Sequence, residues 1–410
     1  MFRLWRTVSV LMVLSHMPAA GVAQVGDART LTIDQAITMA RETSPHVLAA
    51  RARVAEARGR LATASLRLRG NPVLSGGAGR RTVDGEDFTD FNVDVMQGLG
   101  IAGQRRARIE SAEAETMRET AEAEETARRQ MRDVAVAFLR GLHARERLSL
   151  LEESAAVAER MAASAERRLQ AGDVAALDAN LTAAALARAR SEVLSARADL
   201  IDVMGTLSAL LGLQAGEGLT LAGDLSRTPR NEPATPAEQA AQRPDAIALA
   251  AAIAQAEADA RVARTARHPE VDVGAGYERE EEADIVGAAL SISLPFLDRG
   301  QGQAAEADAR ATRLVMERDA LVRAAETEIA TAQESYRQRH EAAMAIEATL
   351  PGVVESEHLA TRSYETGQIS LVDLLIMRGG LQETRRAHLD KLLEAAIAAI
   401  ALEAAAGVLR

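Results

Sequence analysis

The sequence repeats itself over almost its whole length, and this internal duplication is the strongest constraint on how the chain folds. Gly103-Gln104 recurs as Gly300-Gln301, and several other turn-rich pairs recur at a similar separation of roughly 197 residues. A repeat this long exceeds any solenoid repeat, so it indicates duplication of a whole structural half. We predict a first repeat over residues 24–212, a linker over residues 213–236 and a second repeat over residues 237–410.

Each predicted half contains a very long helical stretch followed by a returning helix. The long stretches cover residues 101–170 and 302–366, about 100 Å each at 1.5 Å per residue. Gly172 and Gly367 follow them as left-handed caps, so each half should form a helical hairpin with an exposed tip near residue 172 or 367. Pro351-Gly352 is expected to kink the second stretch. Apolar residues recur there every seven positions, which indicates packing along the whole helix: Val315, Val322, Ile329, Tyr336, Ala343 and Leu350.

Ahead of each long stretch, the hydrophobic period changes from that of a helix to that of a strand. Apolar residues alternate with small or acidic ones over residues of about 72–81, 88–97, 270–279 and 285–296. Strands of roughly 9–11 residues can cross a bilayer. Four strands leave two unpaired edges, which hydrocarbon does not tolerate, so other chains would have to complete the sheet. Three copies would supply twelve strands, an even number found in outer-membrane barrels. A soluble sandwich with one buried face would show the same alternation.

Composition removes several classes of function. The chain has no Cys, which excludes disulfides, thiolate metal sites and thiol catalysis. Its net charge of −11 leaves no basic stripe for phosphates, so no nucleic-acid partner is expected. The sequence contains no phosphate-binding loop, metal-ligand spacing or catalytic signature. We therefore expect no enzyme activity, no cofactor and no bound metal.

The amino terminus has the pattern of an export signal. Arg3 and Arg6 precede a short apolar run over residues 8–14, and a stretch of small residues ends at Ala23. This order is typical of a secretory signal peptide, so we predict cleavage that removes residues 1–23. A membrane-anchoring helix is the alternative, but the apolar run is well short of the roughly 20 residues that a spanning helix needs.

In the order of its elements the chain resembles the TolC-type outer-membrane efflux protein family. The most specific segments are residues 31–36 (LTIDQA), the Gly-Gln steps after the strands, and residues 364–375 (YETGQISLVDLL). The resemblance implies a mostly α-helical fold with a small membrane β-barrel portion. It implies a homotrimer whose twelve-stranded barrel meets outer-membrane lipid and continues as an α-helical barrel across the periplasm. Such a channel is the exit duct of a tripartite efflux pump, which a periplasmic adaptor (membrane fusion) protein joins to an RND-type inner-membrane transporter.

One segment looks most like the heavy-metal-efflux, CzcC-like branch of that family, whose transporters export divalent cations. This segment is residues 96–106 (MQGLGIAGQRR). Two features depart from the family pattern. Many members are lipidated at an amino-terminal Cys, which this chain lacks. Membrane barrels usually carry aromatic girdles, for which few rings are available here: Phe88, Phe91, Tyr277 and Phe296.

By the same resemblance, the hairpin tips are the predicted contact with the adaptor. Glycine permits the positive φ of a tight turn, and small apolar residues beside it would offer a contact surface. The glycines can equally be helix caps alone. The predicted contact residues are Gly172, Val174, Gly367, Ile369 and Leu371.

Asp178 and Asp373 follow the two tips at the same spacing. The resemblance places an acidic residue here at the periplasmic constriction of the pore, where a ring of carboxylates favours cations. Ile376 stands where some relatives carry a second acid, so this ring would be thinner here. The alternative for Asp373 is a charge that complements the dipole at a helix N-terminus.

Two kinds of function stay open at this point. One is the channel of a tripartite efflux or secretion system, and the other is an exported periplasmic coiled-coil scaffold or adhesin stalk. The strands discriminate between them, because a scaffold would expose the apolar face of residues 286–294 to water. Within the channel class, drug efflux and type I protein secretion stay open beside metal export, because the inner-membrane transporter selects the cargo.

Overall fold

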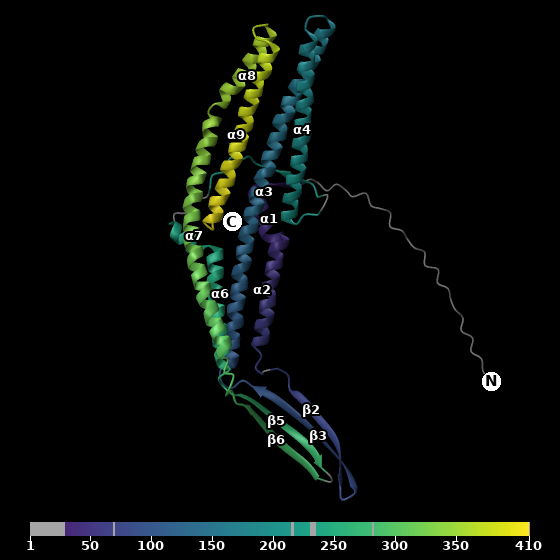
Figure 1. Cartoon of the computed structure of the whole chain (residues 1–410), viewed down its shortest axis with the longest axis vertical. Helices are drawn as coiled ribbons and strands as arrows, with labels where there is room; N and C mark the ends of the chain where they lie inside the picture. The colour runs from purple at the N-terminus through teal and green to yellow at the C-terminus, as the bar shows by residue number, and fades with distance from the viewer. Residues whose placement is uncertain (1–28, 69, 215–216, 230–234, 281–282, 410) are drawn as a thin grey trace, which may run out of the picture.

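The computed structural model describes residues 29–68, 70–214, 217–229, 235–280 and 283–409. The predicted signal peptide lies outside the described residues, as do parts of the predicted linker. Figure 1 shows an elongated molecule in which long helices run side by side and a sheet extends from their lower end. The predicted architecture, mostly helical with a small strand region, is confirmed.

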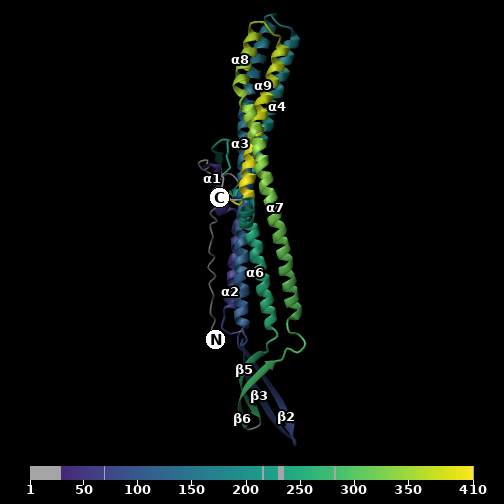
Figure 2. The same cartoon turned by 90° about the vertical axis from the view of Figure 1, so that its left-hand side faces the viewer.

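Helices follow the predicted order in both halves. The first half contains α1 (Ile33–Thr43), α2 (Pro45–Ala64), α3 (Gln104–Gln170) and α4 (Ala176–Leu211). The second half contains α5 (Pro236–Gln242), α6 (Pro244–Thr265), α7 (Gln301–Glu347), α8 (Leu350–Glu365) and α9 (Leu371–Ala405). The helix pairs α3/α4 and α8/α9 form the two hairpins, whose tips lie together at the upper end in Figure 2.

The long helix of the second half is interrupted, whereas that of the first half is continuous. α3 runs for 67 residues without a break. α7 ends at Glu347 and α8 begins at Leu350, with Pro351 in its first turn. Proline has no N–H, and its ring clashes with the carbonyl four residues earlier. The predicted kink is therefore confirmed, and it takes the form of a break between two helices.

Four antiparallel strands form the main sheet. They are β2 (Val73–Val83), β3 (Glu86–Leu99), β5 (Glu270–Glu280) and β6 (Ala283–Ser293), in the order β2-β3-β5-β6. Each half supplies one strand pair, and β3 pairs with β5 in the centre. The turn between β2 and β3 is made by Asp84 and Gly85 with φ values of 52° and 88°, as a two-residue type I′ turn requires. β6 ends at Ser293, ahead of Pro295, which cannot donate to a ladder.

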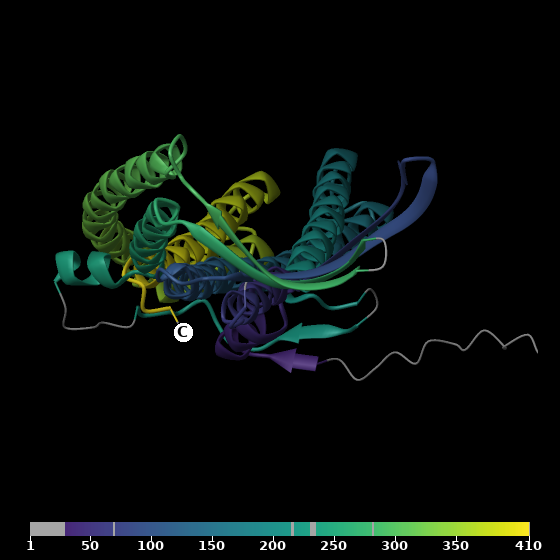
Figure 3. The same cartoon turned by 90° about the horizontal axis from the view of Figure 1, so that it is seen from below.

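A second, smaller sheet was not predicted from the sequence. β1 (Arg29–Leu31) and β4 (Leu219–Leu221) pair in parallel, and Figure 3 shows them beside each other at the flank of the helices. Strands of three residues carry too little pattern to be recognised. The pairing ties the segment ahead of α1 to the connection between the halves.

The main hydrophobic core lies at the waist of the molecule, where α1, α3, α4 and α9 meet. Ile37, Phe138, Leu207 and Ile400 are fully buried there. Away from the waist, the buried side chains of the long helices are mainly alanines, which let neighbouring helices pack closely. The scarcity of aromatic residues therefore follows from a thin core between helices that lie side by side.

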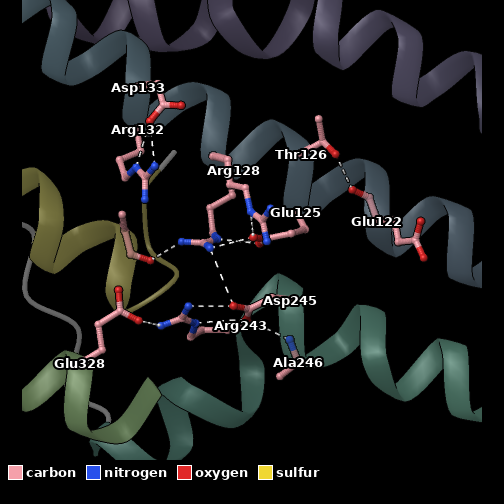
Figure 4. A network of polar contacts seen from close by, with 12 residues as sticks. Glu122, Glu125, Thr126, Arg128, Arg132, Asp133, Arg243, Asp245, Ala246 and Glu328 are labelled. Atoms are coloured by element: carbon pink, nitrogen blue, oxygen red, sulfur yellow. Dashed lines mark hydrogen bonds and ion pairs between the residues drawn. The ribbon is translucent and has the colours of Figure 1, made fainter. Parts of the chain in front are cut away.

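Two buried arginines lie beside this core and bind the end of α9 (Figure 4). Arg128 Nη1 donates to the carbonyl of Ala404 at 2.9 Å, and Arg243 Nη1 donates to that of Ala405 at 3.3 Å. The last four carbonyls of a helix have no partner within it. The arginines satisfy two of them, and they join α3 and the start of α6 to the carboxyl end of α9.

Carboxylates compensate the charges of both arginines. Arg128 donates two hydrogen bonds to Glu125, at 2.7 and 2.8 Å. Arg243 donates to Asp245 at 2.7 Å and to Glu328 at 2.6 Å. Burial disfavours the charged form of Arg243, but these hydrogen bonds outweigh burial and raise the pKa of Arg243 above its usual range. The network is thus a set of mutually paired charges.

Candidate functional site

The two helical hairpins end in turns of the same geometry. Gly172 has a φ of 80° and Gly367 a φ of 76°. The N–H of Gly172 donates to Leu169 O at 3.0 Å, and the next N–H donates to Arg168 O at 2.8 Å. The turn at Gly367 repeats this pair of hydrogen bonds, again at 3.0 and 2.8 Å. This is the Schellman motif, so the predicted caps are confirmed, while an adaptor contact at the glycines stays a prediction.

The helices that leave these turns begin differently. α9 follows Ser370, whose hydroxyl accepts the N–H of Asp373 at 3.2 Å. Asp373 Oδ2 in turn accepts the backbone N–H of Ser370 at 3.2 Å and its hydroxyl at 2.7 Å. This reciprocal arrangement is a capping box. α4 follows Ala175, which makes no side-chain cap.

The two predicted pore acids therefore differ. Hydrogen bonds from the side chain and backbone of Ser370 lower the pKa of Asp373 below its ordinary value. Asp178 occupies the matching position of α4, and within the described part of the chain its carboxylate has no hydrogen-bond or ion-pair partner. In the single chain Asp373 is thus a helix-capping residue, whereas the carboxylate of Asp178 makes no such contact. A pore role for either residue stays a prediction.

The apolar tip residues divide into accessible and buried ones. Val174 and Ile369 are half-buried. Leu371 is only 5% exposed, so its side chain packs inside the molecule and offers little surface to a partner. Val372 and Ile376, at 48% and 68% exposure, lie on the open face of the first turns of α9. Their i, i+4 spacing is the sequence signal that could have identified them.

A cavity of about 650 Å³ lies between the two hairpins near their tips, and Leu371 lines it. Glu357 of α8, 18% exposed, accepts a hydrogen bond from Arg378 at 2.9 Å and pairs with Arg385 at 3.2 Å, both on α9. Farther from the tips, Arg386 of α9 donates to Glu192 of α4 at 2.5 Å. The C-terminal hairpin is therefore held together by partly buried charges. Ion pairs also link its helix α9 to the other hairpin, where Arg386 pairs with Glu192 and Arg385 lies 4.0 Å from Glu153.

The main sheet has one apolar face and one acidic face. Its register places Val93, Tyr277 and Val286 side by side, with the exposed Leu290 on the same face. Alternate residues point to the other face. That face carries Asp90, Asp94, Glu270, Asp272, Glu278 and Glu280, with Arg81 among them. This sidedness is typical of strands that separate lipid from water.

Two findings concern membrane helices and metal sites. Among the residues that the structure describes, no helix is both long and apolar enough to cross a bilayer. The same residues include no group of three or more His, Cys, Asp or Glu side chains placed to hold a metal ion. His143 instead lies 2.7 Å from Asp390, with its Nε2 facing Oδ1, and so joins α3 to α9.

A sheet with an apolar and an acidic face, continued by long packed helices of which α3 alone spans about 100 Å, defines the class of protein: a membrane channel. The chain belongs to the outer membrane efflux protein family, whose model matches residues 36–213 and again residues 235–408. The two matches reflect the duplication.

Relatives of known name and structure agree with this assignment. The chain is 28% identical over 314 residues to the cobalt-zinc-cadmium resistance protein CzcC of Cupriavidus metallidurans, covering 72% of this chain and 71% of that protein. It is 29% identical over 357 residues to the protein CyaE of Bordetella pertussis, covering 80% and 73%. The Campylobacter jejuni CmeC outer membrane channel matches with a TM-score of 0.78 at 16% identity, covering 92% of this chain and 85% of that one.

Family and fold together establish an outer-membrane channel with a long periplasmic part, the exit duct of an efflux system. Channels of this family work in tripartite pumps with an adaptor and an inner-membrane transporter. The family is one of passive channels rather than of enzymes. The predicted channel function is therefore confirmed, and the scaffold or adhesin stalk is not favoured.

Proposed function

We propose that three copies of this chain close into one duct that conducts divalent heavy-metal cations out of the periplasm. The observation that carries this proposal is the open four-stranded sheet with an apolar face. Its edge strands β2 and β6 each have one neighbour within the described residues. Exposed backbone groups at sheet edges cannot remain unpaired in hydrocarbon. Pairing of β6 in one copy with β2 in the next satisfies them, and three copies give the twelve strands of a closed barrel.

The assignment of metal cations rests on similarity and on charge. The relative CzcC is named for cobalt, zinc and cadmium resistance. The acidic sheet face would line the lumen of a closed barrel, and carboxylates there favour cations over anions. Such a wall would favour organic cations as well, so the choice of metal cations depends on the likeness to CzcC.

The hairpin tips are the proposed meeting point with the periplasmic adaptor, beyond which lies the RND-type transporter. Gly172, Val174, Gly367 and Ile369 lie at this end, and the half-buried Val174 and Ile369 offer apolar surface. Asp178 and Asp373 lie in the first turns behind the tips. In a trimer they would supply rings of carboxylates near the periplasmic mouth, with Asp178 as the acid free to meet cations.

Cysteine crosslinking tests the assembly directly, because the chain has no native Cys. We would introduce Ser75→Cys on β2 and scan single cysteines along β6 from Ala283 to Ser293. Under oxidation, one register should give chains linked in a ladder that ends at three. A matched control pairs Ser75→Cys with Ser335→Cys on α7, which should not crosslink. Absence of crosslinks at every β6 position in outer-membrane fractions would refute the closed barrel.

The cargo is tested separately. A strain that lacks this channel should accumulate cobalt, zinc or cadmium, measured by mass spectrometry, and the cloned chain should restore export. In planar bilayers, Asp178→Asn should reduce the cation preference of the reversal potential more than Asp373→Asn does. Normal metal content in the strain without the channel would overturn the metal proposal and leave the trimer intact.

A further inference from the structure

The junction between the sheet and the helices carries both exposed arginines and exposed apolar side chains. It consists of the ends of α2 and α6, the start of α3 and the connection from β6 to α7, which stands out from the helices in Figure 2. We call this region the basic collar. Its basic residues are Arg67, Arg105, Arg106, Arg267 and Arg299, all exposed.

The apolar members of the collar are exposed to an unusual degree. Leu297 is 93% exposed and Phe296 is 72% exposed. Ile101 and Leu66 are 62% and 57% exposed. Large exposed apolar patches usually mark an interaction surface. Ile101, Phe296 and Leu297 come shortly after the strands β3 and β6, and Leu66 lies between α2 and β2. In the proposed barrel the apolar face of these strands meets lipid, so the collar continues the lipid-facing surface at its periplasmic edge.

Most of the guanidinium groups are not engaged by carboxylates. Arg67 and Arg299 have no side-chain partner within the described residues. Among the residues that the structure describes, Arg267 donates only to His268, at 3.3 Å. Arg106 pairs with Glu110 at 2.9 Å, yet its side chain is 87% exposed. Arg105 differs, because it donates to Ser65 O and Leu66 O and so holds the end of α2 in place.

The charge of the collar is opposite to that of the rest of the molecule. The chain as a whole has a net charge of −11, and the far end of the sheet is rich in acids, among them Asp84, Glu86 and Asp87. The arginines lie at one edge of the apolar surface formed by the sheet and the collar. A membrane has the same arrangement, because its anionic headgroups lie at the edge of its acyl chains. An acidic protein surface would match the arginines but would leave the apolar side chains in water.

We propose that the basic collar binds anionic phospholipid headgroups in the periplasm-facing leaflet of the outer membrane. The arginines contact lipid phosphates, and Phe296 and Leu297 enter the interface between headgroups and acyl chains. This contact gives the channel an anchor outside its strands, in a chain whose sequence has no Cys for lipid attachment. The collar thereby fixes the depth at which the sheet meets the membrane.

Native mass spectrometry of the purified full-length channel tests this proposal. The protein is extracted from vesicles of phosphatidylethanolamine and phosphatidylglycerol in a 3:1 ratio, and the retained lipids are counted. The test variant combines Arg67→Gln, Arg106→Gln, Arg267→Gln and Arg299→Gln. The control variant combines Arg160→Gln, Arg167→Gln, Arg323→Gln and Arg339→Gln, exposed helical positions that remove the same charge.

We expect the wild type and the control to retain phosphatidylglycerol over phosphatidylethanolamine, and the collar variant to lose this preference by about tenfold or more. Each basic side chain near an anionic surface strengthens binding by about fivefold. The preference of the wild type should also fall in high salt. Equal retention of both lipids by the wild type, or an equal loss in both variants, would overturn the proposal. Conductance of the same samples in planar bilayers shows independently that the channel has assembled.

Discussion

The two hairpins descend from one duplicated unit, and they agree in backbone geometry while they differ in polar contacts. Both turn through a Schellman motif at a glycine with φ near 80°, Gly172 and Gly367. Within the described part of the chain, only the second hairpin has a capping box after the turn and a partly buried ion-pair cluster, and only the long helix that leads to its tip is broken. The turn geometry set by the tip glycines is therefore the part of the repeat that both copies keep. The break at Pro351 and the side-chain contacts are the parts that differ.

The opposite ends of the hairpins show the same division. The last carbonyls of α4 accept hydrogen bonds from neutral donors, Thr43 and Gln130, at 3.4 and 2.9 Å. The last carbonyls of α9 accept from the guanidiniums of Arg128 and Arg243. The same carbonyl groups are satisfied by polar amide and hydroxyl groups in one half and by a charged network in the other. Substitutions at matched positions should therefore have unequal effects.

The largest inequality is expected at the residues just before Pro45 and Pro244. Arg243→Met leaves the carboxylate of Asp245, which is about as buried as its partner, with only the more distant guanidinium of Arg128 at 3.9 Å. Breaking a buried pair in this way costs about 3–5 kcal/mol. The matched Ser44→Ala should cost almost nothing, because the Ser44 hydroxyl is buried with no partner among the described residues. Denaturant midpoints of the solubilised channel measure the loss of stability in each variant. Equal destabilisation by Arg243→Met and Ser44→Ala would contradict the expected difference between the two halves.

The next effect concerns the charges along the hairpins. The side chain of Glu357 is 18% exposed and forms ion pairs with Arg378 and Arg385. Glu357→Gln should therefore destabilise the C-terminal hairpin by about 2 kcal/mol. Glu159 of the first hairpin pairs with Arg190, but both side chains are about 60% exposed. Glu159→Gln should therefore cost less than about 0.5 kcal/mol. Hydrogen exchange of α8 and α3 resolves the two hairpins, and faster exchange in α8 is expected for Glu357→Gln alone.

Features that depend on local backbone chemistry could be predicted from the sequence. The glycine caps, the break at Pro351 and the alternation of the strands follow from φ preferences, a missing N–H and side-chain period. The waist network could not be predicted, because Arg128 reaches a carbonyl 276 residues away in the chain. The inward packing of Leu371 depends on how α9 rotates against α8, which the spacing of its own residues leaves open. Among the site residues, the turn positions were therefore predictable and their surroundings were not.

A third comparison should show equality instead of difference. An added Cβ at Gly172 or Gly367 meets no atom within 4 Å, so Gly→Ala at either position adds only backbone strain. The left-handed conformation costs an L-residue about 1–2 kcal/mol, and both variants should lose that amount. Gly379→Ala in the interior of α9 is the control, since its Cβ also meets open space and its φ is not positive. It should stabilise the protein by about 0.5–1 kcal/mol, because alanine favours helix over glycine. Thermal unfolding of all three variants checks whether the two turns are energetically alike.

The smallest effect distinguishes the two helix starts. Ser370→Ala removes the capping box and should cost about 1 kcal/mol, whereas Ala175→Ser places a hydroxyl three residues ahead of Asp178 and should gain a similar amount.

The two exchanges also differ in their response to pH. The capping box lowers the pKa of Asp373 from its ordinary 3.8, so its stabilisation is complete above about pH 4 and disappears as the pH falls through the lowered value. The protection factor of the amides at the start of α9, which corrects for the pH dependence of intrinsic exchange, should therefore fall on acidification in the wild type and lose that response in Ser370→Ala. The start of α4 should acquire the response only in Ala175→Ser. A pH response at α4 in the wild type would show that Asp178 already has a partner, most simply in a neighbouring copy of the chain. The contrast between the two tips would then be a property of the single chain and not of the assembled channel.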